Sequence, residues 1–307
     1  MTLQQLKYVI TVAETGTITE AANRLYISQP SLTNAIHELE KEMNLVIFNR
    51  TNKGISISKE GEDFLGYARQ VLEQAAILED KYKGGQGGKK QFCVSTQHYS
   101  FAVNAFVDLI KQYGQDEYDF SLRETQTYEI IDDVAKMRSE VGILFLNDFN
   151  EMVIQKILRS HDLEFHSLFV AKPHVFISRK HPLAGKAVIT NEELEQYPYL
   201  SFEQGEHNSF YFSEEIFSAV ERKKNIRVRD RASLFNLLIG LNGYTVCSGV
   251  IDKKLNGKDI IAVPLADESE MRIGYIVHRK GVMSRLGQTY LDSLKKYLKH
   301  PARIFRS

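Results

Sequence analysis

The sequence predicts a chain in two parts, a small, mainly helical N-terminal domain and a larger C-terminal region of the α/β class. Apolar residues recur at helical spacing in residues 3–43, whereas from Phe92 onward short apolar strands alternate with helices. Glycines at positions 84, 85, 87 and 88 separate the two patterns, and glycine-rich segments of this kind are flexible linkers. The 307 residues, 43% hydrophobic and 25% charged, suit globular domains with a core in each part.

Residues 17–43 predict two short helices joined by a tight turn. Thr17 and Glu20 have the spacing of a capping box at the start of the first helix. Ser28 is a suitable N-cap for the second helix, and Pro30 falls in its first turn, where a missing N–H costs nothing. The apolar stripe of this second helix comprises Leu32, Ile36, Leu39 and Met43.

The opposite face of the second helix is small and polar. It comprises Gln29, Pro30, Thr33, Asn34, His37 and Lys41. Gln and Asn can form paired hydrogen bonds with adenine, and Thr and Pro can contact the thymine methyl group. Such a face is typical of a helix that enters the DNA major groove. The alternative is an ordinary solvated helix face, since helix-turn-helix patterns are short and recur by chance.

Residues 45–58 predict a β-hairpin, because two β-rich runs flank a turn that contains Gly54. Beside a recognition helix such a hairpin is a wing, and Arg50 and Lys53 at its tip can reach phosphate. Residues 1–58 therefore predict a winged helix-turn-helix domain. Its five basic side chains are balanced by five acidic ones, so DNA binding must come from local placement and from pairing of domains.

The chain resembles the LysR-type transcriptional regulators in one dense run, Ala21-Ala22-x-x-Leu25-x-x-Ser28-Gln29-Pro30-Ser31-Leu32-Thr33-x-x-Ile36-x-x-Leu39-Glu40, followed by Leu45-x-x-Phe48-x-Arg50. The resemblance implies promoter DNA, which is double-stranded, as a partner. It implies base contacts by Gln29, Pro30, Thr33 and Asn34, and backbone contacts by Ser28, Ser31, His37, Arg50 and Lys53. Many members carry arginine at the place of Asn34, so the base read there is left open.

Residues 59–83 predict a long helix capped by Ser58. Its apolar residues alternate spacings of four and three, the period of a coiled-coil seam. The seam comprises Phe64, Ala68, Val71, Ala75, Leu78 and Tyr82. The alternative is a helix packed on its own domain, because about three heptads is short for a coiled coil. A homodimer formed here would place two recognition helices about one DNA turn, or a multiple, apart. The resemblance suggests a homotetramer and allows RNA polymerase as a further partner.

The α/β region predicts two lobes. Strands are expected at 92–95, 118–122, 141–146, 175–178, 199–202, 226–228, 244–248 and 271–278, and helices at 101–113, 128–139, 210–221, 233–241 and 284–298. Such a layout resembles the type II periplasmic-binding-protein fold that the family uses as its effector domain. The expected domains are 1–58 for DNA binding, 59–90 for the linker helix and hinge, 91–163 with 268–300 for lobe I, and 164–267 for lobe II.

Ligands of open α/β lobes bind beyond the carboxyl ends of strands. At those places this chain carries hydroxyl and amide side chains near helix starts, which suit a small anionic or amino-acid-like effector. The candidate effector residues are Thr96, Gln97, His98, Gln126, Ser201, Phe202 and Ser248. For each Ser or Thr the alternative is an ordinary helix N-cap.

The sequence indicates no enzyme, cofactor or metal site. Cys93 lies inside an apolar strand, where thiols are usually inert, and the histidines lack metal-ligand spacing. Cys247 at a strand end leaves a thiol-based redox-sensing regulator as one alternative; another is a small-molecule-binding or interaction protein that does not touch DNA. No apolar run approaches a membrane span and the N-terminus lacks a secretion signal, so a cytoplasmic protein is expected.

Overall fold

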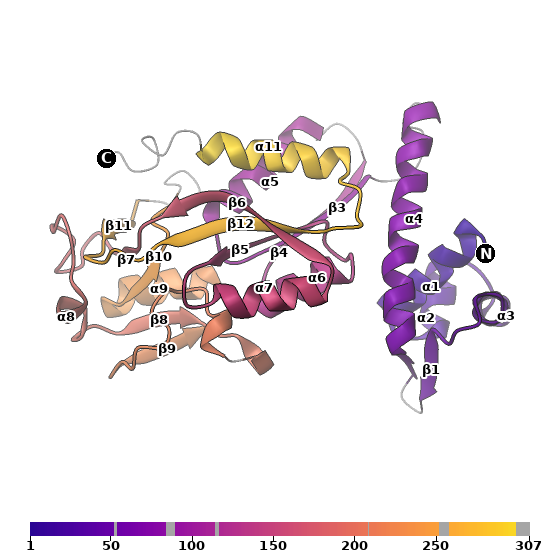
Figure 1. The fold of residues 1–307 in the computed structure, drawn as a ribbon, viewed down its shortest axis with the longest axis horizontal. Helices are drawn as coiled ribbons and strands as arrows, with labels where there is room; N and C mark the ends of the chain where they lie inside the picture. Colours follow the sequence, from indigo (N-terminus) through magenta and orange to yellow (C-terminus); the bar gives the residue numbers. More distant parts are fainter. Residues whose placement is uncertain (52–53, 84–89, 114–116, 208, 252–257, 299–307) are drawn as a thin grey trace. The chain divides into compact units, whose positions relative to one another are not determined.

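The computed structural model describes residues 1–51, 54–83, 90–113, 117–207, 209–251 and 258–298 (Figure 1). They form two compact units, divided at residues 88 and 89, and each unit is described by itself. The predicted wing residue Lys53 and the predicted glycine hinge at 84–88 lie outside the described residues. Among the helices that are described, none is long and apolar enough to cross a membrane.

The N-terminal unit has the predicted winged helix-turn-helix order (Figure 1). Its elements are α1 Leu3–Thr15, α2 Ile18–Arg24, α3 Gln29–Met43, β1 Phe48–Thr51, β2 Gly54–Ile57 and α4 Lys59–Lys83. The N-caps at Thr17 and Ser28 are confirmed, because the Thr17 hydroxyl accepts from the Glu20 N–H and the Ser28 hydroxyl accepts from the Ser31 N–H. Only this half of the predicted capping box at Thr17 is formed among the described residues. The two strands pair antiparallel as a hairpin.

The core of this unit forms between α1, α2 and α3. Leu32 and Leu39 of the predicted stripe are fully buried against Val9 and Val12 of α1. Met43, predicted to complete the stripe, is instead 39% exposed, because it is the last helical residue before the left-handed C-cap. Oε1 of Glu40 accepts from the N–H groups of residues 47 and 48 at 2.7 and 3.1 Å. This carboxylate therefore fixes the wing to α3.

Helix α4 divides the predicted seam into two parts. Ala68 is buried and Phe64 packs against the core of its own domain, together with Leu65. Val71 and Leu78 are 40% and 59% exposed, and the side chain of Tyr82 lies outside the description. Packing within the domain thus accounts for the first part, whereas the second part is open to a partner.

The described residues of the α/β unit form two five-stranded sheets, each at the centre of a lobe (Figure 1). The lobe I sheet has the order β4 Tyr118–Glu124, β3 Lys90–Thr96, β5 Val141–Leu146, β12 Met271–His278 and β6 Leu163–Ala171. Its helices are α5 Ser100–Tyr113, α6 Thr127–Ala135, α7 Glu151–Ser160 and α11 Arg285–Leu298. Strands β3, β4 and β5 are parallel, whereas β12 runs antiparallel to both of its neighbours.

The lobe II sheet has the order β11 Ile260–Pro264, β7 His174–Ser178, β10 Tyr244–Cys247, β8 Tyr199–Phe202 and β9 Asn225–Val228. Its helical elements are α8 Asn191–Leu194, α9 Arg231–Leu241 and the short 3₁₀ helices η1 Gly205–His207 and η2 Phe210–Phe212. The chain therefore leaves lobe I after β6, builds lobe II, and returns to lobe I through β12.

Several elements differ from the predictions. The helix expected at 128–139 ends at Ala135, and α7 and β11 were not expected. The strand at residues 163–171 pairs with β12 in the lobe I sheet, so the crossover follows Ala171 rather than residue 163. Residues 210–221 were expected to be a helix but form only η2 followed by turns. The acidic side chains of Glu214 and Glu215 turn inward there and accept hydrogen bonds from the N–H groups of His98 and Phe202. These tertiary contacts replace the regular helical backbone.

Candidate functional site

The outer face of α3 is the candidate DNA-binding surface. Six of its predicted contact residues are exposed and Thr33 is half-buried; the exposed ones are Ser28, Gln29, Pro30, Ser31, Asn34 and His37. Thr19 of α2 donates its hydroxyl hydrogen to Oε1 of Gln29 at 3.3 Å. Helix α2 therefore orients the amide of Gln29, a role that the sequence reasoning missed. Arg50 lies in β1, and its side chain is outside the description.

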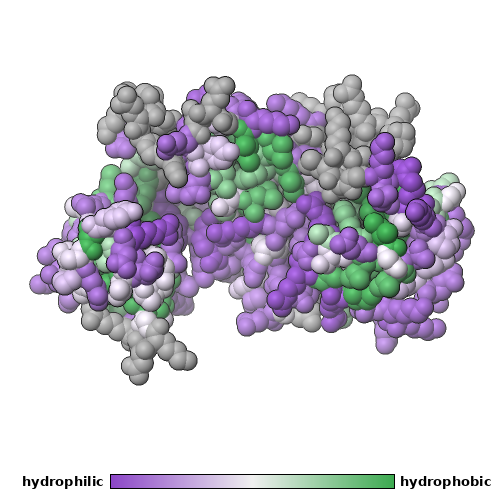
Figure 2. Space-filling model, turned by 180° about the vertical axis from the view of Figure 1, so that it is seen from behind, coloured by the Kyte–Doolittle hydropathy of each residue, from purple (hydrophilic) through white to green (hydrophobic). Residues whose placement is uncertain are grey.

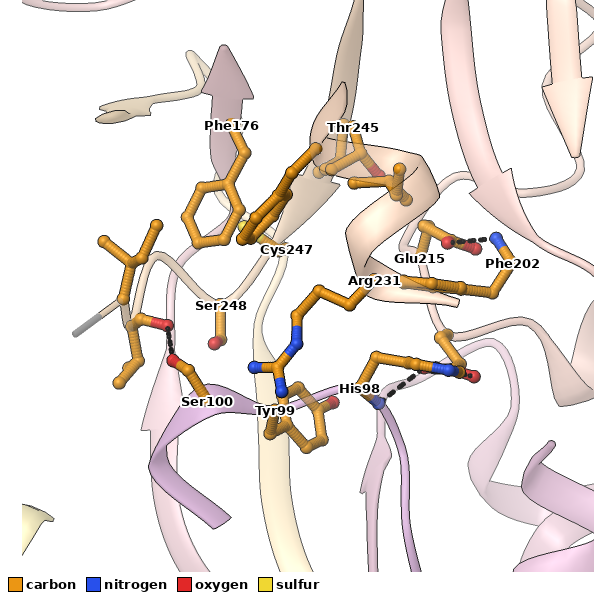
Figure 3. Close-up of a pocket in the computed structure, with 16 residues that line it drawn as sticks. His98, Tyr99, Ser100, Phe176, Phe202, Glu215, Arg231, Thr245, Cys247 and Ser248 are labelled. Atoms are coloured by element: carbon orange, nitrogen blue, oxygen red, sulfur yellow. Dashed lines mark hydrogen bonds and ion pairs between the residues drawn. The ribbon is translucent and has the colours of Figure 1, made fainter. Parts of the chain in front are cut away.

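A cavity of about 50 Å³ lies between the two lobes of the α/β unit (Figure 3). A cavity needs roughly 10–15 Å³ of such volume to hold one water molecule, so there is room for a few waters or one small ligand. Polar lining comes from His98, Ser100, Glu214, Glu215, Arg231, Thr245 and Ser248; apolar lining comes from Tyr99, Phe176, Phe202, Leu234, Phe235, Val246, Cys247, Val250 and Ile251.

A buried ion pair joins the lobes at this cavity. Nδ1 of His98, just after β3, lies 2.9 Å from Oε2 of Glu214, and the two side chains are 5% and 6% exposed. The His98 ring stacks on Phe202 of lobe II, with centroids 3.8 Å apart and planes 5° from parallel. Burial alone would lower the pKa of His98, but the charge and hydrogen bond of Glu214 outweigh burial and raise it. The pair thus favours the charged imidazolium.

Glu215 is the residue after Glu214, and its carboxyl group has a different environment from that of Glu214. Its Oε1 accepts from the N–H of Phe202 at 2.8 Å. Its Oε2 is buried and has no hydrogen-bond partner among the described residues. Burial and the neighbouring charge of Glu214 raise the pKa of Glu215 to about 8. At neutral pH the carboxyl group is therefore mostly protonated.

A second ion pair crosses between the lobes. An amino group of Arg231, at the start of α9, lies 2.6 Å from Oε1 of Glu124, at the end of β4. Burial raises the pKa of Glu124 against the opposing effect of Arg231. Figure 3 shows the Arg231 side chain reaching into the cavity toward Ser248. The guanidinium therefore both links the lobes and lines the space between them.

The predicted effector residues fall into two groups. His98, Phe202 and Ser248 line the cavity. Thr96 and Gln97 are buried and bonded within lobe I: the Thr96 hydroxyl donates to the carbonyl of Gln97, and the Gln97 amide donates to Thr127 at 2.6 Å and accepts from the backbone N–H of residue 145. Their polar groups support the lobe rather than face the cavity.

Gln126 and Ser201 also lie away from the cavity lining. Ser201 is half-buried in β8. With its amide oriented to satisfy both neighbours, Gln126 donates to the carbonyl of Gln204 and accepts from the N–H of Gly205, each at 3.2 Å. Gly205 has a φ of +53°, and a Cβ there would lie 2.6 Å from the Gln126 amide. Gln126 therefore serves as a third contact between the lobes.

The sequence reasoning missed Glu214, Glu215, Arg231 and the aromatic lining. One signal was present: two adjacent acids stand inside a run, residues 210–217, whose other members are aromatic or aliphatic except for Ser213. Acidic residues in such surroundings are almost never fully buried unless they have a partner. The pair could therefore have been marked as a candidate site.

Cys93 and Cys247 are not joined in a disulfide. Burial raises the pKa of the Cys247 thiol well above its ordinary value, so the thiol form dominates, and the thiolate is the reactive species. Sγ of Cys93 lies 3.1 Å from the hydroxyl of Ser139. Within the described ranges, no group of three or more His, Cys, Asp or Glu side chains could hold a metal ion.

Comparison with known families identifies both units. Residues 3–62 match the model for the bacterial regulatory helix-turn-helix protein of the lysR family, and residues 92–299 match the model for the LysR substrate binding domain. The chain belongs to the LysR family. As a LysR-family protein it is a DNA-binding transcription regulator with an effector-binding domain, which confirms the predicted family and fold class.

Relatives of similar length are also named as transcriptional regulators. A probable RuBisCO transcriptional regulator of Phaeodactylum tricornutum is 22% identical over 309 residues, covering 96% of each chain. The RuBisCO operon transcriptional regulator of Allochromatium vinosum is 25% identical, covering 92% of this LysR-family chain and 91% of that protein.

Solved structures share the fold. Full-length OxyR from Pseudomonas aeruginosa has a TM-score of 0.67 at 20% identity, covering 96% of this chain and 95% of OxyR. The LysR-family regulator CbnR has a TM-score of 0.56 at 18% identity, and the alignment covers 97% of this chain and 99% of CbnR. At this identity the likeness concerns the fold alone.

Proposed function

We propose that this LysR-family regulator is controlled by a small anionic or amino-acid-like effector that binds in the cavity between the two lobes. One observation carries the proposal: the cavity is lined by charged and hydroxyl side chains from both lobes, which are themselves joined by ion pairs. A ligand that contacts both sides changes the relative stability of closed and open lobes, and so shifts their populations.

The DNA-binding side of the proposal rests on α3. Its exposed amide and hydroxyl groups suit base edges in the major groove, and the N-terminus of α3 suits a phosphate. We propose base contacts by Gln29, Pro30, Thr33 and Asn34, and backbone contacts by Ser28, Ser31, His37, Arg50 and Lys53. Effector binding then changes DNA contact or bending through the pairing of protomers.

Exposed apolar surface supports a homo-oligomer. Val71 and Leu78 of α4 and Ile239 and Leu241 of α9 are 40% to 59% exposed. Figure 2 shows hydrophobic side chains gathered in separate areas of the α/β unit, with hydrophilic side chains between them. Patches of this kind mark protein interfaces, so we propose a dimer through α4 and further pairing through the α/β unit, as a tetramer requires.

The cavity proposal is tested by a thermal-shift screen of the full chain against small carboxylates and amino acids. A ligand that binds only the folded state raises its stability by mass action. We expect at least one compound to raise the Tm of the wild type but not of Ser248→Leu, which fills the cavity. Ser233→Leu, at an exposed serine of the same lobe, is the control. Equal shifts in wild type and Ser248→Leu would place the ligand elsewhere.

A thiol-based redox sensor was one of the two alternatives left open by the sequence. The raised pKa of the Cys247 thiol opposes it, because a reactive cysteine needs a lowered pKa. We therefore expect Cys247→Ser to leave any response to peroxide unchanged, with less than about a twofold effect on DNA affinity, as for a neutral substitution. Loss of a peroxide response in Cys247→Ser would restore the redox reading.

A further inference from the structure

The cavity contains a carboxyl oxygen for which the protein supplies no partner. Glu215 is only 4% exposed and lines the cavity. Its Oε1 is bonded to the Phe202 N–H, whereas its Oε2 lacks a hydrogen bond within the described part of the chain. A buried polar atom without a partner costs free energy. A ligand donor placed at Oε2 would remove that cost.

The neighbouring acids differ from Glu215 in having a cationic partner. Glu214 pairs with His98, and Oε1 of Glu124, which also lacks a hydrogen bond within the described residues, lies 2.6 Å from an amino group of Arg231. Glu215 stands beside Glu214, and within the described residues neither His98 nor Arg231 forms a hydrogen bond or an ion pair with it. A protonated amine suits this position, because it supplies both the missing hydrogen-bond donor and a positive charge.

Arg231 offers the opposite chemistry in the same cavity. A guanidinium has five N–H donors, and the ion pair with Glu124 uses one amino group. Figure 3 shows the rest of the guanidinium directed toward Ser248, whose hydroxyl can add another donor. This combination suits a carboxylate. The walls between the two polar places are aromatic and aliphatic, so the body of the ligand is apolar and small.

We propose that the cavity binds a small amino acid, with its ammonium group on Oε2 of Glu215 and its carboxylate on Arg231 and Ser248. This inference rests on the proposed function, because it names the effector class of the same cavity. It predicts that the amine and the carboxylate are both required, whereas a simple anion would need only Arg231.

Calorimetry on the full chain tests the proposal with matched probes. The probes are the common α-amino acids, each with the carboxylate that lacks its amine and the amine that lacks its carboxylate, such as alanine, propionate and ethylamine. We expect at least one amino acid to bind about tenfold or more tightly than either matched compound, as a charge-assisted hydrogen bond implies. Glu215→Gln should lower that affinity by a similar factor, because its amide presents a donor to the ammonium group. Glu221→Gln, at an exposed position of lobe II, is the control.

A second readout needs no variant. Ammonium favours the ionised form of Glu215, so binding at pH 7 should release a proton, and the measured heat should change with the ionisation enthalpy of the buffer. The titratable and charged groups that face Glu215 are Glu214, His98, Tyr99, Tyr199, Arg231 and Cys247. Proton uptake, or no exchange, would contradict the assignment to Glu215.

The outcomes separate this inference from the proposed function. If carboxylates bind as tightly as amino acids and Glu215→Gln changes nothing, the amino-acid assignment is overturned while an effector cavity stands. If no amino acid binds, the assignment is likewise overturned, and the wider screen with Ser248→Leu decides separately whether the cavity binds an effector.

Discussion

Replacing Gln29 and Asn34 together by alanine is expected to weaken sequence-specific DNA binding strongly. Both amides are exposed on the outer face of α3, and each paired amide contact with a base contributes about 1–3 kcal/mol of discrimination. Their joint loss should weaken specific binding by about thirtyfold to ten-thousandfold. The measurement is a binding isotherm of the full chain on DNA selected from a random pool.

The matched control is Asn23→Ala, an exposed amide on α2, which should retain specific binding. Binding to unrelated DNA should change little in the double variant, since that affinity comes from phosphate contacts. An unchanged thermal transition would show that the fold is intact. Full retention of specific binding in the double variant would contradict the assignment of α3 as the reading helix.

Breaking the buried pair between the lobes is expected to have the largest effect on stability. His98→Ala leaves the carboxylate of Glu214 buried without its cation, and removing one partner of such a pair costs about 3–5 kcal/mol. Urea unfolding of the α/β unit measures the loss. His161→Ala, at an exposed histidine, should cost less than about 0.5 kcal/mol. A double variant with Glu214→Ala should lose less than the sum of the single variants, because the two residues interact.

The same pair gives the stability a defined pH dependence. Folding raises the pKa of His98 above 6.5. The contribution of His98 to the free energy of unfolding is therefore complete below pH 6.5, and it is lost as the pH rises through the pKa that His98 has in the folded state. The pKa of Glu215 rises from 4.5 to about 8, so folding favours its protonated form, and stability falls across that interval as well. Burial lowers the pKa of His174, His181 and His278, and these groups contribute in the opposite direction. We therefore expect the free energy of unfolding of the wild type, measured relative to that of Glu215→Gln, to decrease between about pH 5 and 8. A relative increase across that interval would contradict the raised pKa of Glu215.

Local signals in the sequence were enough to predict the N-terminal unit. The caps at Thr17 and Ser28 and the stripe at Leu32 and Leu39 depend on neighbours within the same helices, and the structure confirms them. Met43 was wrongly assigned to the buried stripe, because the periodicity of a helix does not show where the elements packed against it end.

The cavity could be predicted only in part. His98, Phe202 and Ser248 lie at or just after the carboxyl ends of strands, so the general rule for α/β lobes located them. Glu214 and Glu215 were assigned to a helix, because the contacts that turn their carboxylates inward come from residues far away in the chain. The same limit applies to β6, whose pairing with β12 joins segments about a hundred residues apart, and non-local pairing leaves no local pattern.

The central claim is that a small molecule in the cavity controls DNA binding by this LysR-family regulator. The most direct measurement compares the affinity and footprint of the full chain on its selected DNA, with and without a compound that stabilises the wild type but not Ser248→Leu. The account predicts that the compound changes the affinity or the footprint of the wild type and leaves both unchanged in Ser248→Leu. The same affinity and the same footprint in the wild type with saturating compound would contradict it.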